Sequence, residues 1–461
     1  MSPKRSAAAA ALLLVSACAA PNYPAPPEAI VTPPPAWRTQ AGPAAPIDQA
    51  WWQRFGDPVL TRLVETALAH NPDIAIAAAR VREARAQESL ARAQLFPTLD
   101  AGVGISRSRS VSPFGLPSES TGVSPIFQAS YEVDLFGRIS DQIAAARGGF
   151  LASEAGRDSA ALATASATAS GYIVLRGLDL RRAVIVDTIA SRAEALRIAR
   201  DRARVGYTSQ LEYRQAEAEY EGTTQLLPQV DLAIARQEDA LSLLLGESPR
   251  AIERGLPLAA LTPPPVPGGL PSDLLRRRPD IAQAEYSLAA SDSSLAAARA
   301  QFLPSLRLSG SAGAAISTLL ANPISLWSIG ASALAPIFEG GRLRAGAEGA
   351  AARRDQAAFA YQRAVLTAFR EVEDQLAAVA RLREQRARLE GQRSALAEVL
   401  RHATNRYQAG YTTYLEQLDA QRNLLNADLA LAQTRTDQLT ALVALYQAMG
   451  GGWSDSDGTR Q

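Results

Sequence analysis

The chain has one cysteine and two histidines, and aromatic residues make up only 6% of it. Cys18 alone cannot form an intrachain disulfide bond. His70 and His402 lie in different halves of the sequence without other metal-ligating residues nearby, so they indicate no metal site. No pairing of a nucleophile with a base can be argued either. With 47 basic and 46 acidic side chains, the chain lacks the charge excess of a nucleic-acid-binding protein. The composition therefore indicates neither an enzyme nor a nucleic-acid-binding protein.

Long apolar runs are also scarce. Beyond the N-terminus, no run approaches the roughly 18 residues that a membrane-spanning helix needs. Any further membrane insertion would have to use strands. Alanine is abundant instead, which favours long helices packed through small residues.

The N-terminal segment has the order of a secretory signal peptide. Lys4 and Arg5 precede an apolar run that ends in small residues, which predicts a signal peptide over residues 1–17. The sequence LVSAC at 14–18 resembles a lipobox, in which the cysteine is lipidated and becomes the first residue of the mature protein. Acyl chains on Cys18 would form a membrane anchor; an incidental or buried thiol is the alternative. By resemblance to bacterial lipoproteins, Ala19 in place of aspartate favours the outer membrane.

Proline marks the boundaries of the chain. It is dense between residues 18 and 48, where it predicts an extended tether along the outside of the protein. It recurs at 256–272, which predicts a linker, and a polar tail follows at 454–461. It is absent between Pro125 and Pro228 and again after Pro336, so both intervals favour long helices.

The body of the chain is duplicated. Residues 71–74 (NPDI) match 278–281 (RPDI), and 93–97 (AQLFP) match 300–304 (AQFLP), both 207 residues apart. Seven positions between Arg202 and Ala216 match residues 204 positions later. Agreement at a fixed spacing is typical of an internal repeat. We therefore predict two repeats, at 49–255 and 273–453.

Each repeat predicts the same succession of elements. A helix begins near Pro72 or Pro279 and stops before the next proline. Apolar and polar residues then alternate, which predicts strands at about 98–110 and 123–135 in the first repeat and about 305–316 and 324–335 in the second. A long helical hairpin follows in each repeat, with its turn near Gly206 or Gly410. The predicted fold is mainly α with a small β part.

Four strands with one apolar face cannot close a barrel, and an open sheet edge is not tolerated in lipid. If three chains each contribute four strands, a barrel of about twelve strands closes. A helix over residues 138–205 would extend roughly 100 Å, too far for a globular core. The helices, attached to the same strands, would continue as a tube on the periplasmic side, so anchor, strands and long helices together predict a duct.

With these features the chain resembles the TolC-type outer-membrane efflux proteins and, within that family, the NodT-type lipoprotein branch. The resemblance covers nearly the whole chain. It is carried by the lipobox, the Pro-Asp-Ile helix starts, YEVDLFGR at 131–138, PIFEGGR at 336–342 and, above all, RYQAGYTTYLEQLDAQ at 406–421. It implies a homotrimer in the outer membrane, with a twelve-stranded transmembrane β-barrel that continues as a periplasmic α-helical barrel. This duct would passively conduct small molecules, with a periplasmic adaptor protein and an inner-membrane pump as partners. It implies no cofactor apart from the lipid on Cys18.

The resemblance also implies roles for the two hairpin turns. They match the family's adaptor-docking turns, which here consist of Val205, Gly206, Tyr207, Thr208 and Ser209, and of Ala409, Gly410, Tyr411, Thr412 and Thr413. We name these ten residues the docking turns.

The family's periplasmic constriction lies just beyond the second turn, where the matching residues are Leu415, Glu416 and Asp419. Acidic side chains repeated around a threefold axis would attract cations; the alternative is a solvated helix face. Arg406 and Tyr407 match residues that hold the closed state by hydrogen bonds between helices, and local packing is the alternative. We name these five residues the gate residues. The first turn has Glu212 but then Gln215, so the full acidic gate is expected on the second hairpin alone.

Two other classes of protein share some of these features. A periplasmic adaptor would have long hairpins, but around a lipoyl-like β domain rather than with duplicated strand pairs. A purely structural coiled-coil lipoprotein would explain the helices but not the strands.

Overall fold

The computed structural model describes residues 21–39, 47–111 and 114–453. The predicted signal peptide, Cys18 and the polar tail lie outside the described residues. The chain forms two compact units. One contains Ala79–Glu154 and Gln283–Arg363; the other contains Val31–Ala78, Ala155–Ala282 and Ala364–Gln461. Each repeat contributes to both units.

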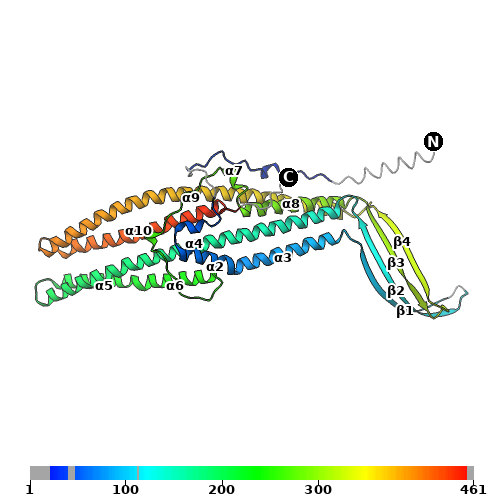
Figure 1. The fold of residues 1–461 in the computed structure, drawn as a ribbon, viewed down its shortest axis with the longest axis horizontal. Coiled ribbons are helices and arrows are strands. Elements are labelled where there is room, and N and C mark those ends of the chain that lie inside the picture. The colour runs from blue at the N-terminus through cyan, green and yellow to red at the C-terminus, as the bar shows by residue number, and fades with distance from the viewer. Residues whose placement is uncertain (1–20, 40–46, 112–113, 454–461) are drawn as a thin grey trace. The chain divides into compact units, whose positions relative to one another are not determined.

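The helices and strands follow the duplicated order that the sequence predicts (Figure 1). The first repeat contains α2 (Pro58–His70), α3 (Pro72–Ala93), β1 (Thr98–Val111), β2 (Pro117–Val133), α4 (Arg138–Arg204), α5 (Gln210–Thr224) and α6 (Leu226–Leu244). The second contains α7 (Pro271–Leu274), α8 (Pro279–Ala300), β3 (Ser305–Ser317), β4 (Ile324–Leu334), α9 (Arg342–Gln408) and α10 (Tyr414–Ala448). Short 3-10 turns occur at η1 (Pro27–Ala29), η2 (Trp51–Phe55) and η3 (Leu258–Ala260). The mainly helical fold with a small sheet is confirmed.

The four strands form one antiparallel sheet in the order β1-β2-β3-β4. Its register places Ala101 opposite Phe127, Phe127 opposite Ala312, and Ala312 opposite Trp327. The next row of the same face joins Leu99, Ala129, Gly310 and Ile329. Because side chains alternate between faces, this register sorts the apolar side chains to one face. The neighbouring row on the other face contains Asp100, Gln128, Ser311 and Ser328.

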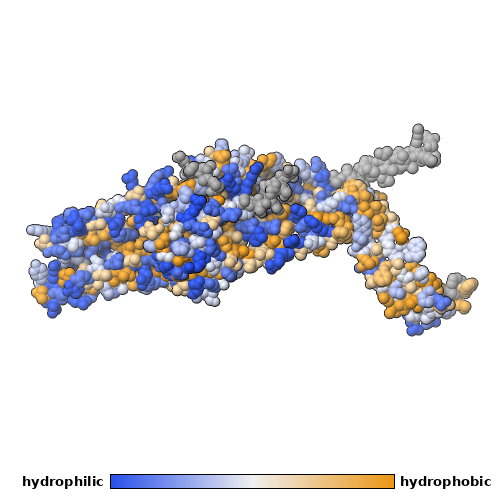
Figure 2. Space-filling view, viewed as in Figure 1, coloured by the Kyte–Doolittle hydropathy of each residue, from blue (hydrophilic) through white to orange (hydrophobic). Residues whose placement is uncertain are grey.

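Within the described residues, β1 and β4 are edge strands, and every position of both is exposed. Trp327 is 76% exposed and Ile329 is 85% exposed. Figure 2 shows hydrophobic side chains gathered over the strands and their junctions with the helices. A single chain therefore leaves the apolar face of its sheet uncovered.

The second strand begins earlier than the alternation pattern predicts. We expected it over 123–135, whereas β2 covers Pro117–Val133. Residues 117–122 are rich in Ser, Pro and Gly and read as a loop by composition. In the structure they pair with the polar end of β1, with Val111 opposite Pro117 and Ser106 opposite Gly122. Pairing across the hairpin overrides the weak strand propensity of these residues.

The first helical hairpin returns in two helices rather than one. α5 ends at Thr224 and α6 begins at Leu226, so Pro228 lies in the first turn of α6. A helix tolerates proline there because the first backbone N–H groups have no partner within the helix.

A buried polar network organises the second unit around Asp57, which is 1% exposed. Its carboxylate caps α2 by accepting a hydrogen bond from the Val59 backbone at 2.8 Å. It also accepts from the Tyr172 hydroxyl and from the Leu256 backbone, both at 2.9 Å. Burial and the neighbouring Asp57 both raise the pKa of Tyr172, so the hydroxyl remains a donor. The linker is thereby fixed to α2 and α4.

Residues 21–39 of the predicted tether form no helix or strand apart from η1. It is bonded to α9, because Arg354 donates to the Pro24 carbonyl at 2.7 Å and Gln362 donates to the Glu28 carbonyl at 2.7 Å. Trp37 donates to the Gly269 carbonyl at 2.8 Å. In the described part of the chain, no helix is both long and apolar enough to cross a bilayer.

Candidate functional site: the hairpin turns and the gate residues

The two hairpin turns are built in the same way. Gly206 and Gly410 have φ angles of 75° and 78°, in the left-handed region that favours glycine. In the first turn, Gly206 N–H bonds the Ala203 carbonyl at 3.2 Å and Tyr207 N–H bonds the Arg202 carbonyl at 2.9 Å. The second turn repeats both bonds, from Gly410 and Tyr411. This pair of bonds is a Schellman motif, which ends a helix after a glycine.

The turns expose apolar side chains. Val205 is 73% exposed, Tyr207 is 78% exposed and Tyr411 is 80% exposed. In each turn a threonine hydroxyl bonds the glutamate four residues later: Thr208 bonds Glu212, and Thr412 bonds Glu416. Ser209 caps α5 by accepting from the Glu212 backbone at 3.3 Å, whereas Thr413 at the start of α10 makes no side-chain cap.

Tyr407 links the two hairpins. Its hydroxyl donates to the Glu212 carboxylate, which lies 195 residues away on the first hairpin. Burial, followed by the bond to Glu212, raises the pKa of Tyr407 to about 12. The hydroxyl therefore stays protonated and able to donate at neutral pH. The Tyr407 ring lies 5.6 Å from the Tyr414 ring, and it contacts a buried cluster that includes Leu196 and Leu418.

Arg406 acts within the second hairpin instead. Its guanidinium donates to Glu416 at 2.8 Å, joining the end of α9 to the start of α10. Both side chains are about half exposed, so the pair is screened by solvent and contributes little stability. Both residues therefore bond between helices. Arg406 joins the two helices of the second hairpin, whereas Tyr407 joins the second hairpin to the first.

The three residues of the predicted constriction do not face one way. Leu415 and Asp419 are four residues apart on α10 and therefore lie on the same face. Leu415 is 55% exposed, and Asp419 is also exposed. Asp419 accepts a hydrogen bond from the Asn423 amide at 3.2 Å. Glu416 turns toward Arg406 and Thr412. The two acids therefore differ. Asp419 has no hydrogen-bonded arginine, whereas Arg406 compensates the charge of Glu416.

Glu212 and Arg202 are not among the predicted gate residues. The duplication makes them equivalent to Glu416 and Arg406, which pair with each other in the second hairpin. In the first hairpin, Glu212 accepts instead from Tyr407, and the Arg202 guanidinium lies 5.4 Å from the centre of the Tyr407 ring. At this distance a cation attracts the face of an aromatic ring. Comparing equivalent positions of the repeats would have identified both residues as candidates.

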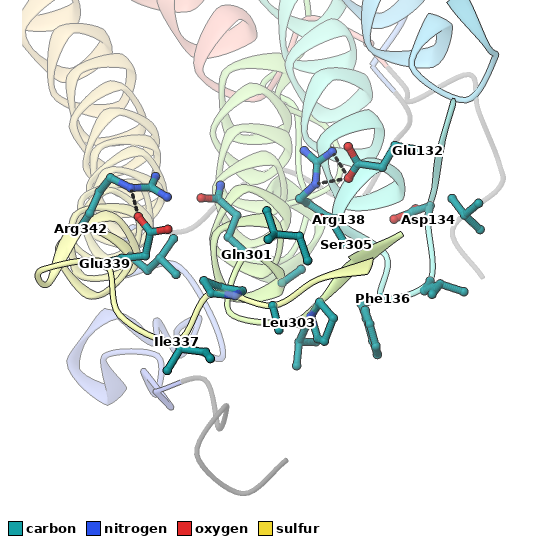
Figure 3. Close-up of a pocket in the computed structure, with 18 of the residues that line it drawn as sticks. Glu132, Asp134, Phe136, Arg138, Gln301, Leu303, Ser305, Ile337, Glu339 and Arg342 are labelled. Atoms are coloured by element: carbon teal, nitrogen blue, oxygen red, sulfur yellow. Dashed lines mark hydrogen bonds and ion pairs between the residues drawn. The ribbon is translucent and has the colours of Figure 1, made fainter. Parts of the chain in front are cut away.

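The structure also has a cavity where the strands join the helices (Figure 3). This cavity of about 600 Å³ is lined by the ends of β2, α8 and β4 and by the starts of α4 and α9. Arg138 pairs with Glu132 at 2.6 Å, and Arg342 pairs with Glu339 at 2.9 Å. The described residues contain no group of three or more His, Cys, Asp or Glu side chains that could hold a metal ion.

Comparison with known proteins connects this architecture to a family. The family described as "Outer membrane efflux protein" matches residues 63–247 and 270–451, the two repeats. The toluene efflux pump outer membrane protein TtgC of Pseudomonas putida is 35% identical over 432 residues, with 91% of this chain and 88% of the relative covered. The pyoverdine export outer membrane protein OpmQ of Pseudomonas aeruginosa is 35% identical over 459 residues, with 94% of each covered.

A solved structure agrees. The CmeC outer membrane channel of Campylobacter jejuni superposes with a TM-score of 0.86 at 26% identity, covering 95% of this chain and 96% of that one. The predicted function, efflux across the outer membrane by a channel rather than an enzyme, is confirmed, as is the outer-membrane location. The two other classes of protein considered above do not account for these matches. This chain belongs to the outer membrane efflux protein family.

Proposed function

We propose that three copies of this chain join their sheets edge to edge into a barrel of about twelve strands. Together with a tube of long helices, this barrel would form the exit duct of a tripartite efflux pump. The observation that carries the proposal is the four-stranded sheet, which has one apolar face and two exposed edge strands. An open edge leaves backbone groups unbonded, which lipid does not tolerate. Pairing β4 of one copy with β1 of the next satisfies both edges.

Cys18 is the proposed lipid attachment site. The signal peptide at 1–17 would be removed before it, and residues 18–48 would form the tether to the first repeat. The bonds from Arg354 and Gln362 to the tether support a path along α9. The repeats at 49–255 and 273–453, joined by the linker at 256–272, would each supply two strands and one hairpin.

The docking turns are the proposed contact with a periplasmic adaptor, which would connect the duct to an inner-membrane pump. The relatives are named as outer membrane proteins of efflux pumps, which supports partners of this kind. The two turns share one backbone motif and expose aromatic rings, as a repeated contact surface would. Relatives named for toluene and for pyoverdine are equally similar to this chain. This favours a duct whose cargo is selected elsewhere in the pump.

The gate residues are the proposed constriction at the periplasmic end. Three copies of Asp419 would form a ring of negative charge that favours cations. Tyr407 would hold the second hairpin against the first through Glu212. The closed state would then depend on a small number of polar bonds near the turns.

The test is the oligomeric mass of the acylated, detergent-extracted protein and its single-channel conductance in a planar bilayer. We expect a trimer with a small, cation-preferring conductance. A folded monomer without conductance would contradict the barrel. A trimer that conducts without cation preference would contradict only the assignment of the acidic ring.

A further inference from the structure

Three charged side chains from different helices meet beyond the docking turns. Arg192 of α4 pairs with Glu219 of α5 at 2.9 Å within the first hairpin. Arg422 of α10, on the second hairpin, donates to the same carboxylate from its Nε at 2.9 Å. Glu219 is seven residues beyond Glu212 on α5, which places it roughly 10 Å further along the helix. The cluster thus joins the hairpins at a second level.

The inner part of this cluster is desolvated. The Arg192 side chain is 6% exposed and that of Glu219 is 13% exposed, whereas that of Arg422 is 51% exposed. Arg192 also donates to the Glu219 carbonyl at 3.0 Å and to the Thr223 hydroxyl. Its Nε is buried and has no hydrogen-bond partner in the described chain. Burial lowers the pKa of Arg192, and Glu219 opposes that shift. Glu219 is therefore held in place from within its own hairpin and presents its carboxylate to Arg422.

Helix packing alone does not require this cluster. The positions equivalent to Arg192, Glu219 and Arg422 in the other repeat are Leu396, Asn423 and Ala218, none of them charged. One hairpin therefore carries a buried ion pair at positions where the other carries uncharged residues, of which Asn423 is exposed. A buried ion pair has a large desolvation cost and is weak evidence for stability. A conformational role explains better than packing does why only the first hairpin has this buried ion pair.

We propose that Arg422 and Glu219, with Arg192 behind them, form a clasp that holds the second hairpin against the first in the closed state. Opening of the duct then requires Arg422 to separate from Glu219 in addition to release of Tyr407 from Glu212. This inference rests on the proposed function and adds gating residues to it.

The informative variant is Arg422→Gln, because it removes the bond between hairpins and leaves Arg192 paired with Glu219. Changing Glu219 would leave a buried arginine without a carboxylate and could prevent folding. We expect Arg422→Gln to raise the open probability in planar bilayers about two- to fivefold, since a partly exposed ion pair is weak. Arg422→Lys keeps the charge and should remain closer to the wild type.

The matched control is Arg393→Gln. It removes an ion pair of 2.8 Å with Asp428 that joins α9 to α10 inside one hairpin. Spin labels at positions 205 and 409 give a readout that does not depend on conductance. Their distance distribution should broaden to longer distances in Arg422→Gln and stay unchanged in Arg393→Gln.

Equal behaviour of Arg422→Gln and Arg393→Gln in both measurements would overturn the clasp. If the wild-type protein is not a trimer or does not conduct, the proposed function fails, and the spin-label distances still decide the clasp. If the wild type conducts as a trimer while Arg422→Gln changes neither readout, only the clasp fails.

Discussion

Two acidic side chains lie within one turn at the start of α10, and their surroundings differ. Glu416 is bonded to Arg406 at 2.8 Å and to Thr412, whereas Asp419 is bonded to the Asn423 amide. Arg422 lies near enough to Asp419 to act on it electrostatically, but its guanidinium is hydrogen-bonded to Glu219. A carboxylate hydrogen-bonded to a guanidinium presents less net charge to a passing ion than one that is not. The two residues should therefore contribute unequally to ion selectivity.

Replacing both acids with alanine should raise conductance and weaken cation preference, with most of the effect coming from Asp419. Asp419→Asn alone should move the reversal potential in a salt gradient toward zero, and Glu416→Gln should move it less. The measurement is the reversal potential of single channels in a planar bilayer. A larger shift in Glu416→Gln would show that Arg406 does not compensate its charge.

Tyr407 gives a prediction with a defined pH range. Its hydroxyl can donate to Glu212 only while protonated, and its pKa in the folded protein is about 12, above the ordinary 10.0. A raised pKa means that the bond contributes fully below about pH 10 and is lost as the pH rises through about 12. Tyr407→Phe should raise the open probability, because a hydrogen bond to a charged group contributes about 1.5–3 kcal/mol.

The difference between wild type and Tyr407→Phe should stay constant from pH 7 to 9, since the hydroxyl remains protonated throughout that range. The readout is open probability as a function of pH. A difference that disappears within this range would rule out the tyrosine hydroxyl as the source of the effect.

At the scale of elements, the turn glycines set the geometry of the hairpins. Gly410 has a φ of 78° with open space around its Cα, so a methyl group would cause backbone strain rather than a clash. Gly410→Ala should destabilise the turn by about 1 kcal/mol or more. Gly391 lies inside α9 with equally open surroundings and an ordinary helical φ. Gly391→Ala should therefore stabilise the protein by roughly 0.5–1 kcal/mol.

Thermal or denaturant unfolding of the detergent-solubilised protein measures both variants. Loss of stability in both would mean that Gly391 has packing partners in the assembly. Equal tolerance of both would mean that the second turn adopts another conformation.

The two faces of β4 give a matched pair of substitutions. Ile329 lies on the apolar face of the sheet, and its neighbour Ser328 lies on the other face, beside Ser311. If the apolar face meets lipid, Ile329→Lys should lower stability in a bilayer by about 2–4 kcal/mol near the midplane. Ser328→Lys should be tolerated, because its side chain would point into the barrel.

The measurement is the fraction of folded trimer after insertion into vesicles. A greater loss for Ser328→Lys than for Ile329→Lys would place lipid on the opposite face of the sheet.

At the scale of the whole molecule, two features would hold the protein in the membrane: the barrel and the lipid on Cys18. They would be physically independent, since one would be a sheet shared between copies and the other a covalent anchor. The intact mass of the mature protein should therefore exceed that of a polypeptide starting at Cys18 by the mass of the acyl groups. With an ordinary cleavable signal peptide, Cys18→Ser should lose this added mass but keep trimer formation and conductance. An unmodified mass in the wild type would contradict the lipid anchor.

The sequence by itself determined the duplicated order of elements and the class of protein. Alternation of apolar and polar residues predicts strands because it is a local property of the sequence, and the register then places Phe127 and Trp327 on one face. Proline-free stretches predict the long helices α4 and α9 for the same reason. The composition of residues 117–122 predicted a loop, but these residues form part of β2 because they pair with β1.

Only the tertiary structure decided which charged and polar residues meet. Tyr407 and Glu212 are 195 residues apart, and Arg422 and Glu219 are 203 apart. Nothing in the local sequence distinguishes Glu219 from other glutamates of α5, because pairing depends on how the hairpins pack rather than on periodicity. Glu416 and Asp419 look equivalent in the sequence, and they differ because the second turn brings Arg406 and Thr412 to Glu416. Local pattern thus fixes elements, whereas contacts between hairpins fix the partners of their polar side chains.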